Sequence, residues 1–378
     1  MSMPDSVTWS GRITADRAGL AALADEWADL YARCPGATPF QTHAWVSAYD
    51  NAYLPAGALR VLEVRRDGRL VSVAPFVLRR RGPFSVLTTV GGAVTDHHDL
   101  LLDPAVSRDE EMWSVLTGTL LGRPDWHVVD LPEVRPGAVA EAWRGRWPGR
   151  SLVRPASVCL ELAAMSLETA LSRLPGRTAN TLRRKVRRVT AAGVEERQIA
   201  VEGVAEAVER LLGLHARQWA GRGGNPEHLT PRFRALLTYA LERLVAEDGA
   251  VLTEFRLHGR LAAAVVELVG HDMLSYYLAG VSPELRDEID TSCLLVPHGL
   301  EMARKAGLSR YSLLRGEEDY KYRWRPESVQ QQRLLLVRPR SIAGTIYLQV
   351  VLLLSGSKRF LKARAPWLRA VRHRLRPR

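Results

Sequence analysis

Residues 63–78 read EVRRDGRLVSVAPFVL, and residues 254–269 read EFRLHGRLAAAVVELV. Each segment is an apolar run, a turn built on Gly-Arg-Leu and a second apolar run, which is the pattern of a β-hairpin. Asp67-Gly68 is a strong turn signal because Gly tolerates a positive φ, and His258-Gly259 is its weaker counterpart. The recurrence of the pattern about half a chain apart predicts a duplicated domain.

A third short apolar run follows each predicted hairpin, SVLTTVGG from Ser85 and SYYLAGV from Ser275. Around these runs, helical and extended patterns alternate, with helices expected near residues 20–31, 109–121 and 288–306. Helices interspersed with antiparallel hairpins predict a mixed α/β or α+β sheet. Pro and Gly residues between 133 and 155 favour a boundary near residue 150. We therefore expect domains at 1–150 and 151–338, followed by a basic C-terminal segment at 339–378.

The composition is that of a globular and strongly basic protein. The 378 residues include 53 Lys and Arg against 41 Asp and Glu, so the formal net charge is +12, which favours anionic partners. Cys34, Cys159 and Cys293 lie far apart, so they predict neither a disulfide framework nor a CxxC metal site, and a reducing cytoplasm is the simplest setting. The first residues lack the pattern of a secretory signal.

The segment SLLRGEEDYKYRW, residues 312–324, concentrates chemistry in a few positions. It reads as a strand that leaves through Gly316 and brings three acids to the place where an α/β sheet opens. A carboxylate there could accept a proton from an amine, and a Tyr could donate to a developing oxyanion or a leaving thiolate. The alternative is a solvated acidic turn paired with Lys321 and Arg323.

The segment SPELRDEIDTS, residues 282–292, leads from a predicted strand into a predicted helix. Asp290, Thr291 or Ser292 can cap that helix, and Arg286 could add a charge-assisted contact to a phosphate held at its start. The alternative is that these residues only cap the helix.

The most basic segment is TANTLRRKVRRVTAAG, residues 178–193. Leu182, Val186 and Val189 fall on one helical face, and the cations Arg183, Arg184, Lys185, Arg187 and Arg188 cover the remainder. Such a face can bind phosphates, or it can simply be solvated. Sequence-specific recognition of nucleic acid is not favoured, because no aromatic interleaving, helix-turn-helix pattern or zinc-finger spacing accompanies the cations.

The segment GGAVTDHHDLLLD gathers Asp96, His97, His98 and Asp99. Adjacent residues of an extended chain point to opposite faces, so the pattern favours a polar strand entry over a metal site, with a substrate contact as the next alternative. His215 and Trp219 share a helix face and are expected in the core or a cleft wall. No metal is predicted.

The sequence resembles the CelD-like (cellulose-biosynthesis-associated) branch of the GNAT acetyltransferases over roughly residues 35–330. The segments that carry the resemblance read PFQTHAWVSAYDNAY, NTLRRKVRRVTAAGV, LHARQWAGRGG, GRLAAAVVELVGHDMLSYYLAG and GLEMARKAGLSRYSLLRGEEDYKYRW. The most specific element is Gly-x-x-x-Tyr-Lys-x-x-Trp, here Gly316, Tyr320, Lys321 and Trp324 with one extra acid in the turn. Tandem GNAT-like domains, as in the peptidoglycan-bridge (FemABX-like) transferases, fit the internal repeat.

The resemblance implies transfer of an acyl group from acetyl-CoA or another acyl-CoA to an amine on a small molecule or a cell-envelope glycan. It implies that Asp319 or Glu318 acts as base, that Tyr320 acts as acid or orienting group, and that Lys321 and Trp324 organise the cleft. The cofactor is expected to contact Arg286, Thr291 and Ser292, with Arg183 and Lys185 near its phosphates or an anionic acceptor. The usual Gln/Arg-x-x-Gly-x-Gly/Ala signature is missing from the loop before the helix. The first domain is expected to have lost cofactor binding and to shape the acceptor cleft.

Two other functions stay open on the sequence alone. An aminoacyl-tRNA-dependent transferase would use the basic helix for tRNA, and a non-catalytic scaffold or nucleic-acid binder would account for the net charge and the altered loop.

Residues 342–354, IAGTIYLQVVLLL, form the longest apolar run, which is shorter than the ~20 residues of a spanning helix. A stretch rich in Lys and Arg follows. Residues 341–378 therefore read either as an interfacial anchor on an anionic membrane or as a terminal helix docked on the body. The expected location is cytoplasmic, with peripheral contact at the inner membrane face under the first interpretation.

Overall fold

Both predicted hairpins form in the computed structural model, which describes residues 7–221, 224–285 and 288–364, with side chains to residue 354. They are β2 (Leu59–Arg66) with β3 (Arg69–Arg81), and β9 (Ala250–Leu257) with β10 (Arg260–Val269). The first turn has φ of 49° and 79° at Asp67 and Gly68, and the second has 52° and 73° at His258 and Gly259. Two successive positive φ values are typical of the type I′ turn that matches strand twist.

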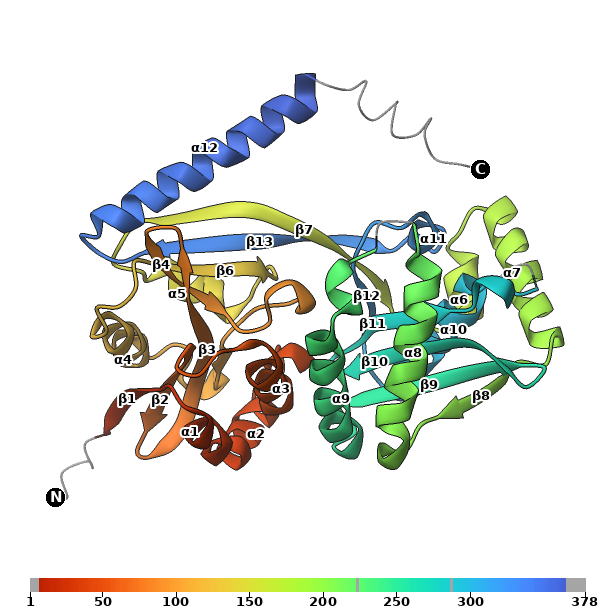
Figure 1. Ribbon diagram of the computed structural model, residues 1–378, viewed down its shortest axis with the longest axis horizontal. Helices are drawn as coiled ribbons and strands as arrows, with labels where there is room; N and C mark the ends of the chain where they lie inside the picture. The colour runs from red at the N-terminus through yellow and green to blue at the C-terminus, as the bar shows by residue number, and fades with distance from the viewer. Residues whose placement is uncertain (1–6, 222–223, 286–287, 365–378) are drawn as a thin grey trace.

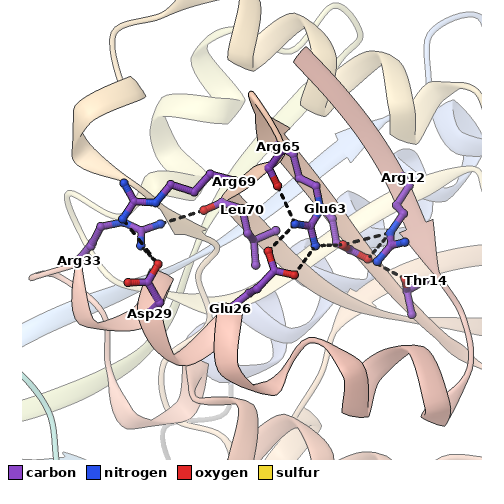
Figure 2. Close-up of polar contacts among 10 residues, drawn as sticks. Arg12, Thr14, Glu26, Asp29, Arg33, Glu63, Arg65, Arg69 and Leu70 are labelled. Carbon is purple, nitrogen blue, oxygen red and sulfur yellow. Dashed lines mark hydrogen bonds and ion pairs between the residues drawn. The ribbon is translucent and has the colours of Figure 1, made fainter. Parts of the chain in front are cut away.

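The repeat extends to a buried ion pair beside each turn. In the first hairpin, Glu63 is buried, and its carboxylate accepts from Arg12 Nε at 3.1 Å and lies 3.4 Å from the Arg65 guanidinium (Figure 2). Arg65 also donates to the backbone oxygen of Gly68 at 3.0 Å, so it ties the strand to its own turn. A buried carboxylate needs such partners to offset its desolvation.

The second hairpin repeats this arrangement residue for residue. Glu254 is buried and lies 3.3 Å from Arg256, which donates to the backbone oxygen of Gly259 at 3.2 Å. Arg210 from a neighbouring helix takes the place that Arg12 has in the first half, with 2.5 Å from its Nε to Glu254. The predicted duplication is therefore confirmed by geometry as well as by sequence.

The described strands form one continuous sheet in the order β1-β2-β3-β4-β6-β13-β7-β12-β11-β10-β9-β8, with β5 paired to β3 (Figure 1). Two pairs are parallel, β4 with β6 and β11 with β12, and the other pairs are antiparallel. The remaining strand bounds are β1 (Trp9–Thr14), β4 (Phe84–Thr89), β5 (Leu101–Leu102), β6 (Val128–Val134), β7 (Ser151–Ala163), β8 (Glu195–Gln198), β11 (Met273–Val281), β12 (Arg310–Arg315) and β13 (Glu327–Val337).

The two halves of the repeat exchange their last strands, which are β7 in the first half and its counterpart β13 in the second. The strand β7 follows β6 along the chain but pairs with β12 of the second half, and β13 follows β12 but pairs with β6 of the first half. The two exchanged strands also pair with each other along nearly their whole length, from Glu327 opposite Glu161 to Leu336 opposite Ser151. The exchange makes each half depend on a strand of the other, which the sequence pattern did not predict.

Helices cover both faces of the sheet. One face carries α2, α3, α8 and α9 over a shared apolar core, and the other carries α4 and α5 on the first half and α6, α7 and α10 on the second. The helix bounds are α1 (Arg17–Ala22), α2 (Ala24–Ala32), α3 (His43–Tyr53), α4 (Glu110–Leu121), α5 (Val139–Gly145), α6 (Leu167–Ser172), α7 (Gly176–Ala191), α8 (Val204–Trp219), α9 (Pro231–Ala246), α10 (Ser292–Lys305), α11 (Asp319–Tyr322) and α12 (Ile342–Arg364).

Some expected elements differ in their bounds. The helix expected near residues 20–31 is two helices, α1 and α2, separated at Leu23. The helix expected from residue 288 begins at Ser292, and it ends before Gly307, whose φ of 69° fits the predicted position after the helix end. The division into domains near residue 150 stays a prediction, because β7 and β13 join the two halves into one sheet.

Candidate active site

The strands β11 and β12 run parallel for only three residue pairs and then separate. Met273, Leu274 and Ser275 lie opposite Arg310, Tyr311 and Ser312, and the paired register ends there. Both strands are irregular at this point. The register of β11 shifts between Tyr276 and Leu278, and Leu314 of β12 has a φ of 53°, which is uncommon for a residue with a side chain. The result is a wedge that opens between two strands of the second half.

Helix α8 lies against the edge of β11 at this wedge. A Cβ atom on Gly280 would come within 2.5 Å of the Leu211 backbone oxygen, so only Gly allows this close approach. His215 Nδ1 lies 2.8 Å from the Ala279 backbone oxygen, and the Gln218 side-chain oxygen accepts from the Val281 backbone N–H at 3.0 Å. Side chains of α8 therefore occupy backbone hydrogen-bonding groups of β11 that another strand, or an extended ligand, would otherwise use.

One cleft of about 520 Å³ lies on the α7 and α10 side of the wedge; we call it the cationic cleft. Among the described residues, its lining carries three cations and two carboxylates. The charged residues that line it are Lys185, Arg188, Arg323, Glu288 and Asp290.

Asp290 lines this cleft, and its side chain accepts from N–H groups at the start of helix α10. Its Oδ1 accepts from the Ser292 N–H at 3.1 Å and the Cys293 N–H at 3.3 Å, and its Oδ2 lies 2.6 Å from Lys185 Nζ and 3.5 Å from Arg323. Although burial alone would raise it, these contacts lower the pKa of Asp290. The N–H groups at the helix start are thus already satisfied by a carboxylate, so an anion in this cleft would meet the cationic side chains first.

A second cleft of about 790 Å³ lies between the two halves of the chain; we call it the inter-half cleft. Its described lining has four carboxylates against two cations, although the whole protein is strongly basic. The charged residues are Asp96, Glu317, Glu318, Asp319, Arg315 and Lys321, and the aromatic ones are Trp219, Tyr276, Tyr277 and Tyr320.

The two clefts meet at Gln218, Tyr276 and Tyr320, which line both of them. The two phenol groups lie close enough to influence each other's pKa. Burial, with nearby acidic groups, raises the pKa of both phenols above the usual value near 10, so both keep their protons at neutral pH. Because both phenols keep their protons and line the junction, their hydroxyl groups can donate hydrogen bonds to a ligand there.

The turn after β12 holds the predicted acids in fixed places. Gly316 has a φ of 111°, and a Cβ atom there would come within 2.6 Å of the Glu318 carboxylate, so the turn requires Gly. Glu318 lies 2.9 Å from Lys321 Nζ, and Lys321 is buried and donates to the backbone oxygens of Leu313 and Arg315 at 2.9 Å. Lys321 therefore holds together the turn that forms part of the cleft wall.

Asp319 differs from its neighbours in the turn. It is exposed, it lines the inter-half cleft, and its carboxylate makes no ion pair within the described part of the chain. Its predicted role as a base is compatible with this position and stays a prediction.

Arg315 connects the active-site turn to the first half. Its guanidinium forms an ion pair with Asp96, donates to the Ala93 backbone oxygen at 2.9 Å and lies 3.6 Å from Glu133. Tyr277 also contacts the first half, because its hydroxyl donates to the Val94 backbone oxygen at 2.9 Å. The first half thus forms one wall of the inter-half cleft.

A pair of neutral histidines forms part of the same cleft. His228 Nδ1 lies 3.3 Å from His215 Nε2, and His215 is held by the Ala279 oxygen described above. Burial, and then the neighbouring His215, lower the pKa of His228 to about 4, and burial also lowers the pKa of His215. Both rings are therefore neutral at pH 7.

Other predicted site residues lie elsewhere. Trp324 is buried in the core cluster of the second half, and Arg183 donates to Asn180 and Glu168 at 3.2 and 3.0 Å; neither lines a cleft named above. Thr291 and Ser292 line the cationic cleft, so their contact with a cofactor stays a prediction, and Arg286 lies outside the described residues. Burial raises the pKa of all three cysteine thiols, so none is poised as a nucleophile.

The equivalent wedge of the first half, between β4 and β6, is filled by the chain itself. The His98 N–H donates to the Glu133 backbone oxygen on β6 at 3.0 Å, and its Nδ1 lies 2.6 Å from Thr89 Oγ1 on β4. His98 thus bridges the two strands. The expectation that the first half has lost cofactor binding stays a prediction.

Tyr276, Gln218 and His228 were not identified from the sequence as site residues. Tyr276 lies in the quoted run SYYLAGV, but its pairing with Tyr320 depends on the wedge. Gln218 and His228 reach the cleft only because α8 packs against Gly280, which no local pattern indicates. Within the described residues, no group of three or more His, Cys, Asp or Glu could hold a metal ion. No helix in the described part is both long and apolar enough to cross a bilayer.

Comparison with known families and structures defines the class. Residues 176–322, which contain the wedge and both tyrosines, match the family model of the acetyltransferase (GNAT) domain. This segment is a GNAT domain, and the protein is a GNAT-type acyltransferase. Among curated proteins, none matches this sequence.

Solved structures show the same fold over nearly the whole chain. The crystal structure of FemX has a TM-score of 0.63 at 11% identity and covers 86% of this chain and 98% of its own. L-PGS from Bacillus licheniformis has a TM-score of 0.53 at 12% identity, covering 90% and 96%. The C-terminal domain of a putative lysylphosphatidylglycerol synthetase from Agrobacterium fabrum has a TM-score of 0.53 at 11% identity, covering 88% and 97%. The fold of two GNAT-like halves in a FemX-like arrangement is thus as expected.

Proposed function

We propose that the protein transfers an acyl group from a CoA thioester in the cationic cleft to an amine in the inter-half cleft. The observation that carries the proposal is that the two clefts, of opposite charge, meet at Gln218, Tyr276 and Tyr320, where β11 and β12 separate. An extended thioester arm between the strands would bring its carbonyl to this junction.

The cationic cleft fits the phosphates of such a donor. Lys185 and Arg323 both contact Asp290, so they already converge on one negative charge and can hold a phosphate beside it or in its place. The arm would compete with Gln218 for the Val281 N–H, so binding is expected to move that side chain. Acetyl-CoA is the donor we test first.

The inter-half cleft fits a positively charged acceptor. Its four carboxylates include Asp319, which has no ion-pair partner in the described chain and is free to meet an ammonium group. We therefore propose a positively charged amine, such as a polyamine or an amino sugar, over a neutral amine. The CelD-like branch and a role in cellulose or other polysaccharide biosynthesis stay predictions from sequence resemblance.

The chain supplies three effects to the reaction. Holding amine and thioester together can contribute ~7–11 kcal/mol toward the barrier. Asp319, or Glu318 if its pair with Lys321 opens, accepts the proton that the amine must lose. The tyrosine pair donates a hydrogen bond to the oxyanion or to the departing sulfur. Since their raised pKa values disfavour full proton transfer, Tyr320 is better suited to donate a hydrogen bond than to act as an acid.

The test combines binding and turnover. Calorimetry with acetyl-CoA, CoA and aminoacyl-tRNA identifies the donor, and release of free thiol in the presence of a polyamine, an amino sugar and a neutral amine reports transfer. For Asp319→Asn we expect about 100-fold lower kcat with acetyl-CoA affinity unchanged. Glu327→Gln, which removes the charge of an exposed acid outside both clefts, is the matched control. No binding of acetyl-CoA, or full activity of Asp319→Asn, contradicts the proposal.

The second candidate is an aminoacyl-tRNA-dependent transferase. The exposed cations Arg184 and Arg187 on α7 flank the cationic cleft and would suit a larger anionic donor. The same calorimetry decides between the two, because tRNA binding that acetyl-CoA does not compete with would favour this candidate. A cytoplasmic location stays a prediction.

A further inference from the structure

Helix α12 is apolar on two opposite faces, and only one of them is covered. Tyr347 and Leu348 are buried in a small core with Val86, Val128 and Leu335. The opposite face carries an exposed stripe, with exposed fractions of 78% for Ile342, 50% for Ile346, 37% for Val350, 71% for Leu353 and 61% for Leu354. At 100° per residue these five side chains fall on one side of the helix, which we call the apolar stripe.

Nothing charged interrupts this surface. Residues 342–354 contain no Asp, Glu, Lys or Arg. A helix that is apolar all round is normally buried, and scattered exposed apolar residues do not form a continuous stripe over several turns. Figure 1 shows that α12 leaves the body at an angle, with only its first part beside the sheet.

Cations border the start of the apolar stripe. A groove of about 780 Å³ is lined by Ile342 and Ile346 together with Arg150, Arg338 and Arg340, and no acidic residue of the described chain lines it. Arg150 and Arg340 are exposed. An apolar surface next to arginines fits an acyl-chain boundary next to a phosphate.

The sequence beyond the stripe is also positively charged. Asp and Glu are absent from residues 328–378, whereas residues 355–378 contain the cations Lys358, Arg359, Lys362, Arg364, Arg369, Arg372, Arg374, Arg376 and Arg378. Single apolar or single electrostatic signals bind membranes only marginally, and their combination gives stable attachment.

We propose that α12 docks on an anionic phospholipid surface, with the apolar stripe inserted at the headgroup boundary and the bordering arginines on lipid phosphates. A second copy of the chain is a poorer occupant. A two-fold interface would bring the same patch against itself, and the described lining of the groove offers no carboxylate to pair with Arg150 and Arg340 there. The inference is independent of the acyl-transfer proposal.

The test uses the full chain and vesicles. Flotation with phosphatidylcholine vesicles containing about one third phosphatidylglycerol is compared with flotation on pure phosphatidylcholine. We expect binding only to the anionic vesicles, weakened by salt. The double variant Ile346→Glu/Leu353→Glu should lose about tenfold or more of this binding. The control is Val7→Glu/Leu229→Glu, which places the same two charges on exposed apolar residues elsewhere and should bind like the unmodified protein.

Several results would overturn the proposal. They are no flotation on anionic vesicles, equal flotation of the double variant, or an oligomer in sedimentation that the double variant converts to monomer, which would assign the stripe to a second copy. Circular dichroism checks that the variants fold. As an independent measurement, a polarity-sensitive fluorophore on Leu353→Cys should shift to the blue with anionic vesicles, and an unchanged spectrum would also contradict insertion.

Discussion

The tyrosine pair at the junction of the two clefts shows how burial sets the chemistry of single residues. Tyr276 comes from β11 and Tyr320 from the turn after β12, and each has its pKa raised mainly by burial. A phenol that keeps its proton costs nothing to reorganise when charge develops on a nearby oxygen. Each phenol therefore contributes to the reaction as a hydrogen-bond donor in a fixed position.

Replacing Tyr320 by Phe should lower kcat about 10- to 1000-fold, because one donor to the oxyanion is lost. Acetyl-CoA affinity should change little, since the phosphates bind elsewhere. Tyr276→Phe, which removes the partner hydroxyl, is expected to have a smaller effect. Steady-state kinetics and calorimetry on both variants measure this. A Tyr320→Phe enzyme with unchanged kcat would remove the pair from the mechanism.

At the residue scale, local pattern carried much of the information. Gly316 and the following acids could be predicted as a turn at an opening sheet because Gly, acids and strand all lie within a few residues. The burial of Trp324 in the core could not be predicted, because it depends on the tertiary packing beneath the turn. The role of Lys321 in organising the cleft stays a prediction. Gln218 and His228 depend on how α8 crosses β11, which is a tertiary contact.

Among the elements, the start of α10 decides how the donor binds. Asp290 satisfies the first N–H groups of the helix and also contacts Lys185 and Arg323. The Asp290 carboxylate repels a phosphate at this position, and it holds Lys185 and Arg323 together when no phosphate is bound. The predicted use of this loop as a phosphate cradle thus depends on side chains more than on the helix terminus.

The substitution Asp290→Asn keeps a helix cap and removes the charge, since Asn and Asp cap about equally well. We expect CoA to bind about tenfold more tightly, corresponding to about 1.4 kcal/mol, with a steeper dependence on salt. Glu288→Gln in the same cleft is the matched control and should change affinity less. Calorimetry at two ionic strengths measures both. Unchanged or weaker binding by Asp290→Asn would show that phosphates do not approach Lys185.

The segment that fills the first-half wedge should make the fold sensitive to acid. Burial lowers the pKa of His98 to about 3 and that of His97 to about 4, against about 6.5 in an unfolded chain. Between about pH 6.5 and 4 the unfolded chain therefore binds protons that the folded chain excludes, so stability falls as pH falls. Asp99, whose pKa burial raises to about 6, works in the opposite direction over part of this range.

For His98→Gln, the free energy of unfolding should depend less steeply on pH between about 6.5 and 4, by about 1.4 kcal/mol per pH unit. Urea unfolding at several pH values measures the slope. The variant starts from a lower stability at pH 7 because it loses the contact to Thr89. An unchanged slope would mean that His98 is not the group that resists protonation.

The whole molecule is held together by the exchange of β7 and β13. Each half gives its last strand to the other, and Arg315 and Tyr277 link the active-site turn to the first half. The hairpins, the third strands and the mixed sheet could be predicted because each has a local pattern of alternation and turn residues. The exchange of β7 and β13 could not be predicted, because a strand has the same alternation of apolar and polar residues whichever neighbouring strand it pairs with.

A fragment of residues 1–150 should not fold by itself. It would expose the edge of β6 that normally pairs with β13, and it would lack Leu334 and Leu336 from its core. Circular dichroism and urea unfolding of the fragment, beside the full chain, measure this. A cooperative transition of the fragment would contradict the strand exchange as a requirement for folding.

The most direct measurement of the central claim is a crystal structure with a non-reactive thioether analogue of acetyl-CoA. The account predicts phosphates at Lys185 and Arg323, the arm between β11 and β12 with Gln218 displaced, and the acyl end beside Tyr276 and Tyr320. An analogue bound elsewhere, or an arm that does not enter the wedge, would contradict it.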